Sequence, residues 1–98
     1  MSTWLRCKAS PGQFSGEWAV RAQAFDGSEF SLFAPEEYVD FSEQHEEEGG
    51  VDAWLRVDKF ESQDELNLVR LPRQPLENGQ FVTVRASQLR ARANPQEA

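Results

Sequence analysis

The sequence predicts a small all-β domain, either a five- or six-stranded barrel or a strongly bent antiparallel sheet. The chain has 98 residues, enough for one small domain and too few for two. Most of it divides into short segments in which apolar and polar residues alternate, as in half-buried strands. Turn signals such as Asp26-Gly27 and Asn78-Gly79 separate these segments. Only residues 35–41 have the character of a helical turn.

Residues 51–72 are predicted to form a central β-hairpin. In its first arm, Trp54 and Arg56 lie on one face, and the opposite face is apolar and is expected to line the core. That apolar face consists of Val51, Ala53, Leu55 and Val57. A polar connection at 61–65 leads to the second arm, 66–71, whose inward face stays open because apolar residues occur on both of its sides.

Further strands are predicted at 3–9, 17–25 and 28–34, the last two forming a hairpin around Asp26-Gly27. In the first of them, one face is apolar and carries Leu5, Cys7 and Ala9. Phe14, in the loop that follows, is expected to plug one end of the core.

Residues 35–41 begin with Pro35 and two glutamates, a combination that favours the first turn of a helix. A single short turn is expected there, followed by a mobile acidic loop at 43–50. The alternative is an α+β domain with a genuine helix at 35–47. A weak apolar stripe spaced i, i+3, i+7 supports it: Tyr38, Phe41 and His45.

A last strand is predicted at 80–86, with Leu89 capping the core. The domain is then expected to span 1–89, and 90–98 to be a disordered tail. The predicted core is Val20, Phe30, Leu32, Leu55, Val57, Val82 and Val84, together with Trp18. The spacing of the strands is similar to that of SH3-like barrels, and this resemblance concerns the fold alone, which licenses no function.

The chain is acidic, with a net charge of -7 and a pI of about 4.6. This balance argues against non-specific binding of DNA or of an anionic membrane by the whole surface. The charge is uneven: residues 1–66 hold five basic against fifteen acidic residues, and 67–98 hold five against two. Cys7 is the single cysteine, so no intramolecular disulfide can form and a cytoplasmic monomer is expected.

Catalysis is not predicted, because no nucleophile and base stand together around the single cysteine, Cys7, and the single histidine, His45. His45 lies among glutamates that can in principle ligate a divalent metal. Consecutive carboxylates lack the spacing of a rigid cage, however, so neither a metal nor another cofactor is predicted. The chain is therefore interpreted as a non-catalytic binding module.

Two tryptophans break the apolar-in, polar-out pattern of their strands, and this predicts an exposed protein-binding patch. The patch would consist of Trp4, Arg6, Lys8, Trp54 and Arg56. A loop or the 35–41 segment that covers both tryptophans would instead make them a satellite core. The alternative function is RNA binding through a groove lined by Arg70, Arg73, Arg85, Arg90 and Arg92. A protein partner is preferred over RNA, and no DNA or membrane contact is expected.

Overall fold

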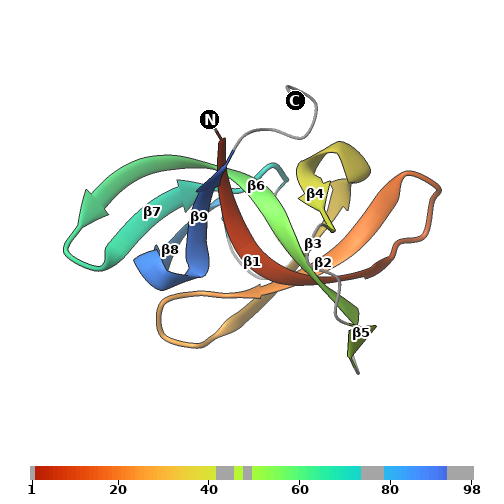
Figure 1. The fold of residues 1–98 in the computed structure, drawn as a ribbon, viewed down its shortest axis with the longest axis horizontal. Coiled ribbons are helices and arrows are strands. Elements are labelled where there is room, and N and C mark those ends of the chain that lie inside the picture. Colours follow the sequence, from red (N-terminus) through yellow and green to blue (C-terminus); the bar gives the residue numbers. More distant parts are fainter. Residues whose placement is uncertain (1, 42–45, 48–49, 74–78, 93–98) are drawn as a thin grey trace.

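The computed structural model describes residues 2–41, 46–47, 50–73 and 79–92. In these residues the chain forms one strongly curled antiparallel sheet, a half-barrel without α-helix and with two short 3-10 turns (Figure 1). The predicted strongly bent all-β sheet is confirmed. The α+β alternative is wrong: the described part of 35–47 holds the 3-10 turn η1 (Glu36–Tyr38) and two very short strands.

The sheet is ordered β3-β2-β1-β6-β7-β8, and the short strands pair outside this path. The strands are β1 (Ser2–Pro11), β2 (Glu17–Gln23), β3 (Glu29–Pro35), β4 (Val39–Asp40), β5 (Glu46–Glu47), β6 (Gly50–Gln63), β7 (Leu66–Arg70), β8 (Phe81–Arg85) and β9 (Leu89–Arg92). The second 3-10 turn, η2 (Ala86–Gln88), joins β8 to β9. Both β4 and β5 pair with β6, and β9 pairs with β1.

The core lies on the inner face of the curled sheet, around the long pairing of β1 with β6. Leu5 stands opposite Leu55 in this pairing, and both side chains are fully buried. All seven aliphatic and phenylalanine residues predicted for the core are buried, whereas Trp18 is partly buried at its edge. Period-two alternation therefore identifies the inner face correctly in each strand to which it assigned one. In 66–71, where the pattern left the face open, Val69 and Leu71 belong to the core.

The curl arises because one edge of β1 is shared by two strands. Residues 8–11 pair with β2, and residues 2–5 pair with β9. The turn after β2 then reaches the far end of the sheet: the Phe25 N–H donates to the Thr83 carbonyl at 2.9 Å, and Arg85 Nε donates to the Phe25 carbonyl at 2.9 Å. These bonds link the β2–β3 hairpin to β8 and hold the half-barrel in its curled form.

The hairpin of β6 and β7 is longer and tighter than predicted. β6 extends to Gln63, so the turn comprises only Asp64 and Glu65, and Asp64 adopts a φ of 55°. A bulge between Lys59 and Glu61 shifts the pairing with β7. The inward face of β7 carries Asn67, which is 6% exposed and accepts a 2.7 Å hydrogen bond from the Ser62 hydroxyl.

Two further predictions are wrong, one about Phe14 and one about where the C-terminal tail begins. Phe14 does not plug the core, because its side chain is 71% exposed. Residues 90–92 are not part of a tail: they continue β9, because the first half of β1 offers them an open edge. Residues 93–98, and most of the predicted acidic loop at 43–50, lie outside the described residues.

Candidate functional site

Trp4 and Trp54 are buried, with exposed fractions of 0% and 3%. The exposure that the predicted patch requires is absent at both tryptophans, and the alternative, a covered satellite core, is correct. Neither tryptophan belongs to the inner core, since each alternates with the core-facing residues of its strand. They lie on the outer face of β1 and β6 and form a second buried layer there. The Trp4 Nε1 has no hydrogen-bond acceptor among the described residues.

Arginine side chains cover this aromatic layer. The guanidinium carbon of Arg6 lies 5.4 Å from the centre of the Trp54 ring, and that of Arg90 lies 4.5 Å from it. Arg56 lies 5.0 Å from the ring centre of Tyr38. We call this surface the Arg–Trp face and define it as Trp4, Arg6, Lys8, Trp54, Arg56 and Arg90.

Strand pairing explains why these residues meet. Trp4 stands opposite Arg56 on β6 and opposite Arg90 on β9, and Arg6 stands opposite Trp54. Residues directly opposite in antiparallel strands point to the same face. The structure thus brings together all five residues of the predicted protein-binding patch and adds Arg90.

The Arg–Trp face carries more basic than acidic groups among the described residues. Lys8 forms a 3.1 Å ion pair with Asp52. Asp40 stands opposite Trp54 in the pairing of β4 with β6, which places a second carboxylate on this face. The described contact of Arg6 is its cation–π contact with Trp54, and its side chain is exposed. Arg6, Arg56 and Arg90 are therefore held against aromatic rings, and the side chains of Arg6 and Arg90 are exposed.

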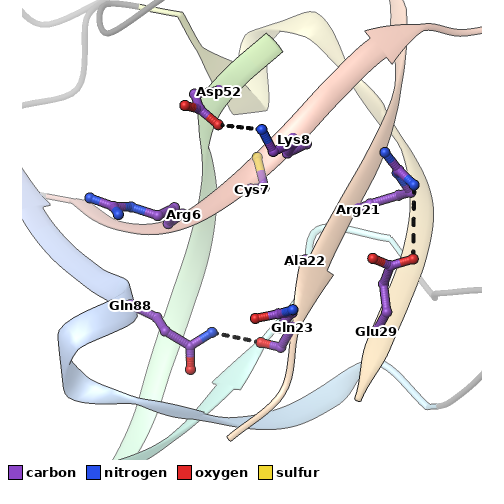
Figure 2. Close-up of a pocket in the computed structure, with 9 residues that line it drawn as sticks. All are labelled: Arg6, Cys7, Lys8, Arg21, Ala22, Gln23, Glu29, Asp52 and Gln88. Carbon is purple, nitrogen blue, oxygen red and sulfur yellow. Dashed lines mark hydrogen bonds and ion pairs between the residues drawn. The ribbon is translucent and has the colours of Figure 1, made fainter. Parts of the chain in front are cut away.

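A hollow of about 360 Å³ opens beside Arg6 and Lys8 (Figure 2). It lies where the edge of β1 passes from its partner β2 to its partner β9. On one side, Gln88 Nε2 donates to the Gln23 carbonyl at 2.8 Å, and Lys8 with Asp52 lies on the opposite side in Figure 2. The hollow extends the Arg–Trp face toward β2.

Cys7 contributes to this hollow but is not a nucleophile. Burial, and secondarily the carboxylate of Asp52, raises the pKa of the Cys7 thiol to about 12. The side chain is only 4% exposed. A thiol that stays protonated at neutral pH does not supply the thiolate that covalent catalysis requires.

The five arginines proposed for an RNA groove are not brought together. Arg70 pairs with Asp58 at 2.7 Å, and Arg85 donates to the Phe25 carbonyl. Arg73 lies beside Phe14 and Phe33, and Arg90 belongs to the Arg–Trp face. Arg92 pairs through its backbone with Ser2. These positions are spread over several parts of the sheet.

One exposed aromatic pair was not predicted from the sequence. The rings of Phe60 and Phe81 meet edge to face at 5.1 Å, with exposed fractions of 52% and 48%, and Arg70 lies 5.4 Å from the Phe60 ring centre. Phe60 has the parity of the outward-facing Asp58, and Phe81 alternates with the buried Val82, so alternation puts both on the outer face. The sequence gives no signal for their contact, because it does not reveal the strand order β6-β7-β8 that brings them together.

No family model, curated protein or solved structure matches this chain. Across residues 2–41, 46–47, 50–73 and 79–92, no three His, Cys, Asp or Glu side chains gather as a metal site would require. His45 lies outside those ranges. Within the same ranges, there is no helix with the length and apolar character needed to cross a membrane.

Proposed function

We propose that the protein is a small non-catalytic binding module that recognises an acidic segment of another protein through the Arg–Trp face. One observation carries the proposal: the guanidinium groups of Arg6 and Arg90 both lie over the ring of the buried Trp54. The role of the tryptophans differs from the one expected from the sequence. They support the binding arginines instead of contacting the partner.

The physical advantage of this arrangement is pre-organisation. An arginine on an open surface loses rotamer entropy when it binds a carboxylate. A guanidinium already held over an aromatic ring has lost part of that freedom before the partner arrives. The cation–π contact uses the face of the guanidinium and leaves N–H donors at its edge, which can bind a carboxylate through two parallel hydrogen bonds.

The uneven charge of the protein favours one orientation of an acidic partner. The protein as a whole carries a net charge of -7, and an acidic partner is repelled by most of such a surface. Arg6, Arg56 and Arg90 form a locally basic area on this background. An acidic segment is therefore steered to one face, which favours a defined orientation in the complex.

The test uses octaglutamate as the acidic probe, with binding measured by calorimetry at low salt. The variant Arg6→Gln/Arg90→Gln removes both charges over Trp54, and we expect it to weaken binding by about tenfold or more. The matched control is Arg70→Gln/Arg85→Gln, which removes two charges from β7 and β8 and is expected to change the affinity less than about threefold. Equal losses in both double variants would contradict the proposal.

The RNA alternative has its own arm in this test, with octauridylate as the probe. Both tryptophans are buried, so neither offers the open ring on which a base stacks. We therefore expect octauridylate to bind more weakly than octaglutamate. Tighter binding of octauridylate, with an affinity that falls steeply with salt, would favour the RNA alternative instead.

A further inference from the structure

A second surface of the protein is acidic, whereas the Arg–Trp face is basic. An open hollow of about 720 Å³ lies where β2, the η1 turn and β4 meet. Its lining includes Trp18, Pro35, Glu36, Glu37, Val39 and Phe41. The hollow shares no lining residue with the Arg–Trp face, so conclusions about one surface do not depend on the other.

Aromatic rings form one wall of this hollow. The ring centres of Trp18 and Phe41 are 4.7 Å apart, and the two planes are inclined at 56°. Both side chains pack against the inner core and are only partly buried, so they are anchored on one side and open to the hollow on the other. Aromatic rings carry electron-rich faces, the feature that attracts a cation.

The polar groups of the hollow are acidic. Glu36 and Glu37 lie in the η1 turn, both exposed, and no basic side chain lines the hollow among the described residues. The carboxylates of Glu36 and Glu37 would repel a carboxylate ligand. An uncharged apolar ligand would gain nothing from their charge. A cation with apolar groups around its charge satisfies both the rings and the carboxylates.

We propose that this acidic aromatic hollow binds an alkylammonium group, of the kind carried by choline or by a methylated lysine side chain. A quaternary ammonium fits better than an ordinary lysine, because it is weakly hydrated and has methyl groups that pack on Trp18 and Phe41. Glu36 and Glu37 add attraction at longer range without direct hydrogen bonds.

Tryptophan fluorescence provides the measurement, because Trp4 and Trp54 are buried and Trp18 is the partly exposed one. Choline chloride is titrated against wild type at constant ionic strength, and a saturable change in fluorescence is expected. The variant Glu36→Gln/Glu37→Gln is expected to weaken choline binding by about three- to tenfold. The matched control, Glu61→Gln/Glu65→Gln, removes two exposed acids near the β6–β7 turn and is expected to change it less than twofold.

The decisive comparison is 3,3-dimethylbutan-1-ol, which has the shape of choline with carbon in place of the charged nitrogen. Saturable binding of choline with at least about tenfold weaker binding of the alcohol supports the proposal. Equal binding of the two ligands, or no saturable binding of choline, overturns it. The variant Phe41→Leu, checked for folding by its thermal midpoint, should also weaken choline binding.

A further arm distinguishes the two sources of the alkylammonium group. An N-acetylated trimethyl-lysine amide represents a modified protein, and choline represents a free small molecule. The proposal requires choline to bind through the hollow, and whichever of the two ligands binds more tightly identifies the source. Because octaglutamate binding tests only the Arg–Trp face, the two proposals fail independently.

Discussion

Arg90, in the last strand of the sheet, lies with its guanidinium carbon 4.5 Å from the ring centre of Trp54, in the central strand. The two residues are far apart in the sequence and meet because β9 and β6 pair with opposite edges of β1. This contact ties the end of the described chain to the outer aromatic layer. It also holds the exposed Arg90 side chain on the outer face of the sheet.

We predict that Trp54→Ala lowers the free energy of unfolding by about 3–5 kcal/mol, the range for buried tryptophan. The ring is 3% exposed and supports two guanidinium groups, so its loss removes apolar burial and both cation–π contacts. Arg6→Ala should cost only about 0.5–1 kcal/mol, because its side chain is exposed. Urea denaturation measures both values. A Trp54→Ala cost no larger than that of Arg6→Ala would show that the outer layer is not a packed layer.

Leu55→Ala is predicted to cost about 2–5 kcal/mol, since Leu55 is fully buried opposite Leu5 at the centre of the core. Lys59→Ala, in the exposed part of the same strand, serves as the control and should change stability by less than about 0.5 kcal/mol. The measurement is again urea denaturation. A harmless Leu55→Ala would mean that the register of β6 differs from the one described.

The inner core could be predicted from the sequence because alternation alone assigns each residue of a strand to a face. The same rule placed Trp4 and Trp54 together on the other face, and that placement is correct. Their burial could not be predicted, because alternation does not say what covers a face. The cover includes Arg90, which reaches Trp54 only through a strand that pairs far from its own position in the sequence.

Gly50→Ala is predicted to destabilise the protein by about 1–3 kcal/mol. Gly50 has a φ of 130°, and a Cβ built on it would lie 2.8 Å from the Ala9 carbonyl oxygen of the backbone. Gly79→Ala is the matched control: nothing lies within 4 Å of its Cβ, so the change should be close to neutral. Thermal denaturation compares the two variants. Equal effects would contradict the close approach of Gly50 to β1.

Cys7 is predicted to make stability fall at alkaline pH. Burial raises the pKa of its thiol from about 9.0 to about 12, so the unfolded chain loses the proton at a lower pH than the folded protein. The stabilisation that comes from the buried, protonated thiol is complete below pH 9. As the pH rises from 9 toward 12, the free energy of unfolding falls by about 1.4 kcal/mol for each pH unit. Cys7→Ala, which lacks the thiol, should show a shallower decline in urea denaturation between pH 8 and pH 10. Parallel declines would place the thiol in contact with water.

The candidate site was only partly predictable. Residue types and alternation identified Trp4, Arg6, Lys8, Trp54 and Arg56 as sharing a face. The roles within that face depend on distances: Arg6 and Arg90 lie over the ring that had been expected to bind the partner itself. The contact of Phe60 with Phe81 depends on the order of β6, β7 and β8 in the sheet, which alternation cannot reveal.

The most direct test of the proposed function is a map of backbone amide shifts in the NMR spectrum while octaglutamate is added. The account predicts that the largest shifts cluster on the outer face of β9, β1 and β6, at Arg6, Trp54, Arg56 and Arg90. Residues around the exposed pair Phe60 and Phe81 should shift little. Shifts centred on that pair, or spread evenly over the sheet, would contradict the assignment of the Arg–Trp face as the binding surface.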